Sequence, residues 1–288
     1  MIQKTKRKLK HYLYDLLDRV YVPFDKQYIF RGKNILQIPH KKNRRGGKLS
    51  YAEWAHVIGI FQTLMFVHLG QRENNQIVDI GCGTGLLGIA SKPFLGENGC
   101  FVGIDVIKRD IEFCRKHYTS SKYSFIHFDV SNAAYAPEQR KGILPWSLES
   151  NRFDLVTALS VWTHFQEKDA LFYIGEVSRV LKSGGKAIIT FFLLDDAYER
   201  TLSTRTHKKG EFHMTEQIRW IFDQPAYGSD AWFCPRWVNV PEEAIGITKE
   251  GFERLIRETD LSVITHYQGN WKEIPGVFFQ DVVVFQKT

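Results

Sequence analysis

The spacing of apolar and polar positions changes along the chain at about residue 76. Before that point the spacing is helical. Apolar side chains recur at helical intervals from His11 to Val20, which predicts a short amphipathic helix whose apolar face docks on the body. A second helix is expected to begin after an N-cap at Ser50 and to run to about Leu69.

From residue 76 onward, short β-rich runs alternate with helical segments. Regular alternation at this spacing predicts βαβ units and a parallel sheet covered by helices on both faces. The expected strands are 76–80, 100–105, 123–129, 153–160 and 185–194, and the expected helices lie near 85–94, 108–118 and 169–182. A helix capped by Thr248 and two closing strands, 261–268 and 279–286, are expected to complete the chain.

The alternation stops after Leu194. Residues 195–247 are expected to form an insert, because they hold a dense group of large aromatic residues without a regular period. Such a group either closes over a ligand, with rings such as Trp232 or Trp237 stacking on it, or forms a small satellite core. The aromatic residues are Trp220, Phe222, Tyr227, Trp232, Phe233 and Trp237.

Charge is distributed unevenly along the chain. Residues 1–48 hold 14 lysine and arginine residues against 3 acidic ones, a net charge of +11, and residues 49–288 hold 25 against 29, or −4. The basic residues fall in two clusters, 4–10 and 41–48. A basic arm of this kind is compatible with binding to phosphates or to an anionic membrane surface, and also with a plain solvated segment.

The remaining composition narrows the class of protein. With 43% hydrophobic and 25% charged residues the chain can bury a sizeable core. Its four cysteines form no CxxC pair, which argues against a disulfide scaffold or a zinc ribbon. No apolar run reaches the ~20 residues of a membrane span. The basic start leads into Tyr14, Asp15 and Asp18 instead of an apolar signal segment, so a cytoplasmic protein, monomeric or homodimeric, is expected.

A glycine-rich turn carries the clearest chemical signal. The first strand runs into residues 79–85 (DIGCGTG), where alternate glycines let the backbone turn sharply and approach a ligand closely. Asp105 ends the second strand, twenty residues past Gly85, where a carboxylate accepts hydrogen bonds from both ribose hydroxyls and repels a 2′-phosphate. The third strand ends in 128–130 (FDV), which offers an acceptor for an adenine amine and an apolar wall.

These residues resemble the class I S-adenosylmethionine-dependent methyltransferases over roughly 77–194. The resemblance rests on 78–85 (VDIGCGTG), 103–105 (GID), 128–130 (FDV), 153–156 (FDLV) with Ser160 and His164, and 179–185 (RVLKSGG). A finer resemblance, to poorly characterised bacterial methyltransferases of small molecules or glycans, rests on Gly46-Gly47, 132–135, 191–194, and 269–271 with Gln280-Asp281.

The family resemblance implies a fold, a cofactor and a site. The fold is an α/β, doubly wound, mostly parallel seven-stranded sheet with one antiparallel strand, here extended by the N-terminal helical arm and the inserted cap. The cofactor is S-adenosyl-L-methionine, with Asp79 at its methionine end, Asp105 at the ribose and Asp129 at the adenine. Each Asp also has a plain alternative role as a helix cap. The full cofactor set is Gly47, Asp79, Gly81, Cys82, Gly83, Gly85, Asp105, Val106, Asp129, Val130, Leu159 and Ser160.

Several acceptor classes lose support from residues that are missing. Residues 159–162 (LSVW) replace the Asn/Asp-Pro-Pro-aromatic turn of methyltransferases that act on base amino groups. Cys234-Pro235 reverses the Pro-Cys order that cytosine C5 chemistry uses. Ser160 stands where metal-assisted O-methyltransferases carry an acid, so no metal is expected. Direct displacement remains, with a hydroxyl oxygen of a small molecule or carbohydrate as the expected acceptor and a nitrogen or carbon atom as the alternatives.

A hydroxyl acceptor must lose a proton, and His164 is the leading candidate for the base. It follows the fourth strand at the carboxyl edge of the sheet, where ligands bind in open α/β folds. The alternative is that His164 only packs beneath the cofactor. His207, His213 and Asp195 in the insert are weaker candidates for the base.

The expected organisation has four parts. Residues 1–75 are expected to form the basic helical arm and a cofactor lid, and 76–194 the cofactor-binding core. Residues 195–247 are expected to form the aromatic insert, which caps the substrate, and 248–288 the closing helix and strands. Three other functions stay open: an RNA methyltransferase that uses the basic arm, a non-catalytic S-adenosylmethionine-binding protein, and an NAD oxidoreductase.

Overall fold

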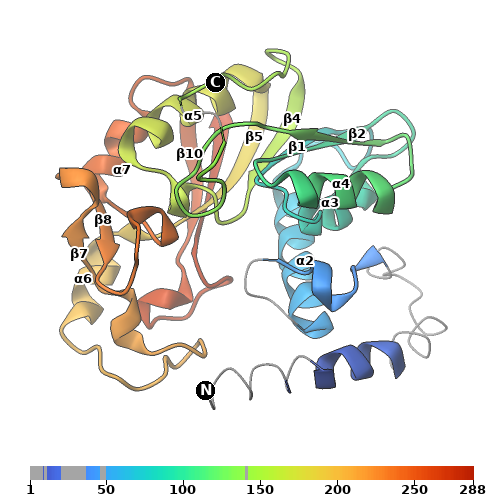
Figure 1. Ribbon diagram of the computed structural model, residues 1–288. Coiled ribbons are helices and arrows are strands. Elements are labelled where there is room, and N and C mark those ends of the chain that lie inside the picture. Colours follow the sequence, from blue (N-terminus) through green and yellow to red (C-terminus); the bar gives the residue numbers. More distant parts are fainter. Residues whose placement is uncertain (1–8, 10–11, 21–36, 46–49, 140–141) are drawn as a thin grey trace.

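The fold is built on one seven-stranded sheet, shown in Figure 1. The computed structural model describes residues 9, 12–20, 37–45, 50–139 and 142–288. The strands lie in the order β10-β11-β5-β4-β1-β2-β3, and β11 runs antiparallel to both of its neighbours. The predicted fold class is therefore confirmed. The strands are β1 (Gln76–Ile80), β2 (Cys100–Asp105), β3 (Tyr123–His127), β4 (Phe153–Ala158), β5 (Leu181–Phe191), β10 (Leu261–Tyr267) and β11 (Asp281–Lys287).

Both faces of the sheet are buried, because consecutive residues of a strand point to opposite sides. In β11, Val282 and Val284 belong to one core and Val283 and Phe285 to the other, all fully buried. Three helices cover the first face: α2 (Tyr51–His68), α3 (Leu86–Ser91) and α4 (Lys108–His117). Helices α5 (Glu167–Val180) and α7 (Lys249–Ile256) cover the second.

Local signals fix the start of two predicted helices. The Ser50 hydroxyl accepts a hydrogen bond from the Glu53 N–H at 3.1 Å, and the Glu53 carboxylate accepts one from the Ser50 N–H at 3.0 Å, forming a capping box at the start of α2. The Thr248 hydroxyl caps α7 by accepting from the Gly251 N–H. Both caps confirm the sequence-based predictions.

Some strand ends differ from the prediction. Strand β3 stops at His127 instead of 129, and β4 stops at Ala158 instead of 160. Strand β5 begins at Leu181, directly after α5, instead of at 185. The chain turns away after β4 because Ser160 adopts a left-handed backbone conformation with φ 59°.

The insert contains a second sheet that the aromatic pattern did not predict. Its strands are only two to four residues long, too short to show a period. They are β6 (Leu193–Leu194), β9 (Gly246–Thr248), β8 (Trp232–Pro235) and β7 (Phe222–Pro225), in that spatial order, with helix α6 (Asp196–Leu202) beside them. Short 3₁₀ helices cover Lys41–Asn43, Lys92–Phe94, Trp162–His164, Gln217–Trp220, Ala226–Gly228, Pro241–Glu243 and Asn270–Lys272.

Residues 12–20 are helical as predicted, and we call them the N-terminal helix. The expected docking of its apolar face is wrong, since the Leu13 and Leu16 side chains are 58% and 59% exposed. Its acidic side chains make the contacts instead: Asp18 accepts from Arg44 at 2.6 Å, and Asp15 lies 2.9 Å from His40. No helix in the part of the chain that the structure describes is long and apolar enough to cross a bilayer.

Candidate active site

A cavity of about 910 Å³ opens at the carboxyl ends of the parallel strands. Gly81 and Gly83 line it after β1, Asp105 after β2, and Leu159 and Ser160 after β4. Strands β1 and β4 are neighbours, and the chain leaves them toward opposite edges of the sheet. This switch in strand order is where open α/β sheets bind their ligands.

The glycine turn after β1 exposes bare backbone to this cavity. Gly81, Gly83 and Gly85 all have positive φ values, 68°, 51° and 88°. At Gly83 a side chain would meet nothing closer than Arg45 at 3.8 Å, so the space above it belongs to the cavity. At Gly85 a Cβ would lie 2.6 Å from the Tyr118 ring. Gly85 therefore serves the packing of Tyr118, and it does not line the cavity.

Asp105 is held by two backbone groups at the edge of the cavity. Its carboxylate accepts hydrogen bonds from the N–H groups of Gly83 and Ile107, both at 2.7 Å. Burial raises the pKa of Asp105, and the two N–H groups partly offset that rise. Its carboxylate has further lone pairs that could accept from a ligand's hydroxyl groups, and Val106 also lines the cavity.

Asp79 lies behind the glycine turn and is 2% exposed. Burial raises its pKa to about 8, although the Thr157 hydroxyl donates a hydrogen bond to it at 2.7 Å and favours the ionised form. A positively charged ligand group nearby would stabilise the carboxylate. Asp79 is not among the residues that line the cavity.

Other members of the expected cofactor set divide between the cavity and its surroundings. Val130 lines the cavity together with its neighbour Phe128, whereas Asp129 is exposed and lies outside it. Cys82 is buried beneath the turn, and burial raises the pKa of its thiol. Gly47 lies outside the described residues.

Ser160 and Gln280 form a polar edge between the glycine turn and the far side of the cavity. The Ser160 N–H donates to the Thr190 hydroxyl at 2.7 Å, and the Gln280 Oε1 accepts from the hydroxyls of Ser160 and Thr190 at 2.9 and 2.7 Å. Gln280 is 6% exposed and lines the cavity. Because its oxygen is occupied, its amide nitrogen is the group left to donate to a ligand.

His164 also lines the cavity, and both of its ring nitrogens have partners. Nδ1 donates to the Glu242 carbonyl at 2.6 Å, so Nε2 accepts from the Tyr135 hydroxyl at 3.1 Å. Burial lowers the pKa of His164 to about 4, with the Glu242 carbonyl acting in the opposite direction. The imidazole is therefore neutral at pH 7 and is a weak proton acceptor.

A second imidazole, His213, stands on the far side of the cavity with a carboxylate behind it. Its Nε2 is 2.7 Å from Glu273 Oε1, and its Nδ1 is 2.9 Å from the Thr215 hydroxyl. The Glu273 carboxylate can only accept hydrogen bonds, so the His213 Nε2 that faces it carries the proton. Nδ1 is then the unprotonated nitrogen and accepts a hydrogen bond from the Thr215 hydroxyl. The Trp220 N–H donates to the same hydroxyl at 2.7 Å. The side chains of His213 and Glu273 are 6% and 10% exposed.

The sequence analysis missed two members of this group, Thr215 and Glu273. Glu273 follows His213 by sixty residues and shares no motif with it. Glu273 has a φ of 61°, and its carboxylate also accepts from the Glu211 N–H at 3.1 Å and from Gln217 at 3.2 Å. An acid immediately after the buried 270–272 turn is the only signal in the sequence.

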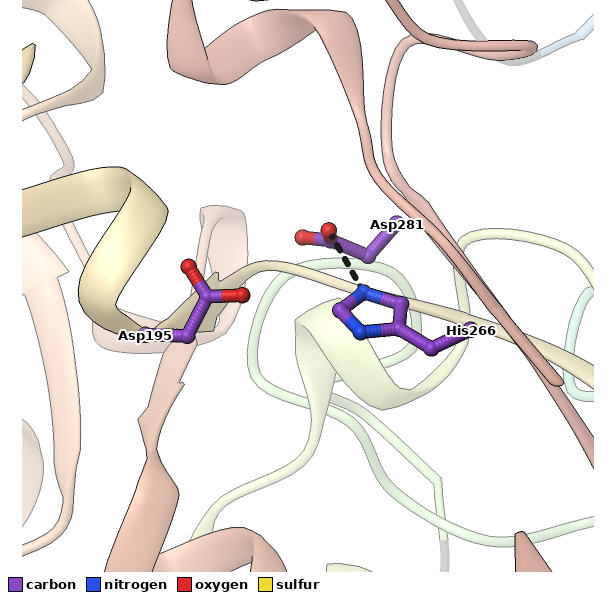
Figure 2. A group of neighbouring side chains, drawn as sticks. All are labelled: Asp195, His266 and Asp281. Atoms are coloured by element: carbon purple, nitrogen blue, oxygen red, sulfur yellow. Dashed lines mark hydrogen bonds and ion pairs between the residues drawn. The ribbon is translucent and has the colours of Figure 1, made fainter. Parts of the chain in front are cut away.

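The two other candidate bases lie away from the cavity. His207 is exposed. Asp195 caps α6 and forms a group with His266 and Asp281 that resembles a metal site, shown in Figure 2. The Lys272 ammonium already supplies a positive charge there, 2.8 Å from Asp195 and 2.7 Å from Asp281, and it is fully buried. This group is a buried ion-pair cluster that holds the closing strands together.

The aromatic insert forms a satellite core and contributes only part of itself to the cavity. Trp232 is fully buried in the main core, and Trp237 stacks against the Arg219 guanidinium at 3.6 Å. Neither ring lines the cavity. Of the insert's aromatic residues named above, Trp220 lines the cavity, and it packs there against Phe192 and Phe279, which line it too; we call these three rings the aromatic wall.

The N-terminal region contributes a cover to the glycine turn. Arg45 lines the cavity and makes two hydrogen bonds to the buried Asp110, at 2.5 and 2.6 Å. The Thr84 hydroxyl donates to the Asn43 carbonyl at 2.6 Å. Arg44 and Arg45 are thus both engaged in ion pairs within the protein.

Comparisons with known proteins agree with this geometry. A family model described as a methyltransferase domain matches residues 71–274. The chain is 24% identical to the sterol 24-C-methyltransferase of Kluyveromyces lactis over 230 residues, 76% of this chain and 52% of that protein. It is 32% identical to the ubiquinone biosynthesis O-methyltransferase of Pelagibacter ubique over 113 residues, 39% of this chain and 40% of that protein. It therefore spans about half, or less, of the length of these curated relatives.

The fold is also shared with solved structures. A methyltransferase from Methanosarcina mazei superposes with a TM-score of 0.50 at 20% identity, covering 77% of this chain and 96% of that one. A protein from Pyrococcus horikoshii superposes with a TM-score of 0.52 at 18% identity, covering 82% and 92%. These similarities concern the fold alone.

Proposed function

Since the chain belongs to the class I S-adenosylmethionine-dependent methyltransferases, we propose that it methylates a hydroxyl group of a small acceptor with an apolar body. The observation that carries this proposal is the pairing of His213 with Glu273 and Thr215 at the far side of the cavity, next to the aromatic wall. An apolar wall with a few convergent polar groups is typical of a small-molecule site.

The residues on the near side fit the family's cofactor. When bound, S-adenosylmethionine supplies a methyl group on a positively charged sulfur. We propose that Asp105 accepts its ribose hydroxyls, that the backbone of Gly81 and Gly83 lies against it, and that Val106 and Val130 hold the adenine between them. Two desolvated carboxyl groups, Asp79 and Asp105, favour a ligand that carries positive charge.

The acceptor's proton needs a path out of the cavity. In the proposed path, the acceptor oxygen gives its proton to the Thr215 hydroxyl as that hydroxyl passes its own proton to His213 Nδ1. Glu273 then stabilises the imidazolium through the Nε2–H bond at 2.7 Å. The arrangement of acid, imidazole and hydroxyl follows the general logic of a hydrogen-bonded catalytic triad.

His164 takes a positioning role in this proposal. Its ring connects Tyr135, which lines the cavity, to the Glu242 carbonyl of the insert. An imidazole whose pKa is lowered to about 4 is a weak base and takes a hydroxyl proton poorly. Loss of His164 should therefore affect acceptor binding more than the rate of transfer.

The test is an acceptor screen for S-adenosylhomocysteine release, covering phenols and quinols, isoprenoid alcohols, sugar nucleotides and RNA. On the best acceptor, His213→Ala should lower kcat by about 10²- to 10⁴-fold, and Glu273→Gln by a smaller factor, with cofactor affinity unchanged. His207→Ala is the matched control, because it removes an exposed imidazole of the same insert outside the cavity. It should leave turnover unchanged.

Other outcomes would assign the role of the base to His164, or would favour one of the alternative functions. If His164→Ala lowers kcat as strongly as His213→Ala while KM for the acceptor stays the same, His164 is the base. Turnover on RNA alone would support the nucleic-acid alternative, although Arg44 and Arg45 are already engaged within the protein. Tight cofactor binding without turnover on any class would support a non-catalytic binding protein.

A further inference from the structure

The N-terminal helix carries an exposed apolar stripe. Tyr12, Leu13, Leu16 and Val20 are 76%, 58%, 59% and 47% exposed, and they recur at the spacing of one helix face. Leu17, at the edge of the stripe, is 37% exposed. Contiguous apolar surface of this kind marks an interaction site in a soluble domain.

The helix is attached to the protein by its opposite, acidic face. The Asp18 and Arg44 side chains form an ion pair at 2.6 Å and are 9% and 1% exposed. Asp15 adds a contact to His40 at 2.9 Å. In Figure 1 this helix, drawn in dark blue, lies along the lower edge of the molecule, away from the central sheet. The acidic anchor therefore turns the apolar stripe outward.

The chain before this helix is strongly basic. Lys4, Lys6, Arg7, Lys8 and Lys10 place five positive charges within seven residues, with no acid among them. Each basic residue near an anionic bilayer adds to the attraction of the chain to the lipid phosphates. An amphipathic helix with aliphatic and aromatic residues on one face and adjacent basic residues is the pattern that lies in a membrane interface.

We propose that the N-terminal helix docks the protein on the surface of an anionic lipid bilayer. Tyr12, Leu13, Leu16 and Val20 enter the interface, and the basic residues 4–10 attract the lipid phosphates. The ion pair between Asp18 and Arg44 transmits the attachment to the body, and the next residue, Arg45, lines the cavity. This inference does not depend on the identity of the methyl acceptor.

Two other partners for the N-terminal helix, a nucleic acid and a second copy of the chain, fit its surface less well. A nucleic acid would engage the basic residues, but exposed leucines offer nothing to phosphates or to base edges. A second copy of the chain would cover the leucines, but it would bring two clusters of five positive charges together. Only an anionic, apolar surface satisfies both features.

The experiment is co-sedimentation of the full chain with vesicles of phosphatidylcholine alone and of phosphatidylcholine mixed with phosphatidylglycerol. The protein should bind the phosphatidylglycerol vesicles, and the binding should weaken as salt is raised. Leu16→Glu should lower the partition coefficient by about tenfold or more, because it replaces buried apolar area by a charge that the lipid repels.

Val67→Glu is the matched control. Val67 lies on the exposed side of α2 at 61% exposure, so the change removes an equally exposed aliphatic residue and adds the same charge. It should bind vesicles like the parent protein, and the melting temperature of each variant should show that it is folded.

Four results would overturn the proposal. The first is no binding to phosphatidylglycerol vesicles. The second is equal loss of binding in Leu16→Glu and Val67→Glu. The third is a concentration-dependent dimer or an RNA complex that Leu16→Glu disrupts while vesicle binding stays absent. A double variant, Leu13→Glu/Leu16→Glu, should abolish binding, and full retention there would contradict the role of the stripe directly.

Discussion

Asp79 is a carboxyl group that folding places in an unfavourable environment. Burial raises its pKa to about 8, well above the value of an unfolded aspartate. Between the two values the folded protein holds a proton that the unfolded chain releases, so the stability of the cofactor-free protein falls as pH rises through that window. Above pH 8 the full destabilisation is present.

This environment leads to a prediction about stability and binding together. Asp79→Asn keeps the acceptor for the Thr157 hydroxyl and removes the charge. At pH 8.5 it should raise the free energy of unfolding of the cofactor-free protein by about 1–3 kcal/mol, with little effect at pH 4. Cofactor affinity measured by calorimetry should fall. An Asn variant with unchanged stability at both pH values would contradict the burial argument.

Asp105 should behave differently, since two backbone N–H groups already stabilise its carboxylate. Asp105→Ala should weaken S-adenosylmethionine binding by about 1.5–3 kcal/mol, the scale of charge-assisted hydrogen bonds. Calorimetry on the folded variant decides the matter. Unchanged affinity would remove Asp105 from the cofactor site.

At the scale of elements, the proposed base depends on a short turn in the insert. The Gly210 N–H donates to the Thr215 carbonyl at 2.9 Å, and this turn folds the His213 ring over Gly210. A Cβ on Gly210 would lie only 2.3 Å from that ring. The turn therefore sets the position of His213 relative to Glu273.

Gly210→Ala should displace the His213 ring without unfolding the protein, because the turn is exposed and the ring can rotate away. We expect kcat to fall by about tenfold or more, as for a misplaced catalytic group. Gly59→Ala is the control, since a Cβ there meets nothing within 4 Å. Equal kcat values for both variants would argue that His213 takes no part in turnover.

At the scale of the whole molecule, Asp281 joins the end of the core at Leu193 to the closing segment around residues 266–272. Its carboxylate accepts from the Leu193 N–H, the Trp271 indole and the buried Lys272 ammonium, at 3.0, 2.9 and 2.7 Å. Burial alone would raise the pKa of Asp281, but the hydrogen bond from His266 and the Lys272 charge outweigh it and hold the pKa below its usual value. The carboxylate thus stays ionised at the centre of several elements.

The predicted consequence is acid sensitivity. A depressed folded-state pKa contributes stability above the unfolded value, and this contribution is lost as pH falls below about 4. Asp281→Asn should destabilise the protein by about 3 kcal/mol at pH 7, because it removes the negative charge that pairs with the buried Lys272 ammonium. It should also flatten the acid limb, the fall in stability at low pH. Urea unfolding from pH 3 to 7 measures both. An Asn variant with the parent's acid limb would assign that limb to other carboxylates.

The sequence by itself determined the alternation of strands and helices in the core, the helix caps and the glycine turn. These features depend on neighbouring residues: alternation of apolar positions, a Ser50 to Glu53 spacing, glycines that adopt positive φ. Their signals are therefore visible in a single chain. The family resemblance over 77–194 rests on the same local motifs.

The tertiary structure alone decided which side chains meet. His213 and Glu273 are sixty residues apart, and packing of the insert on the closing strands brings them to 2.7 Å. The N-terminal helix could be predicted from its period, but the outward direction of its leucines follows from the Asp18 contact with Arg44. Periodicity defines a helix face, whereas the partner that this face meets is set by distant residues that no local pattern contains.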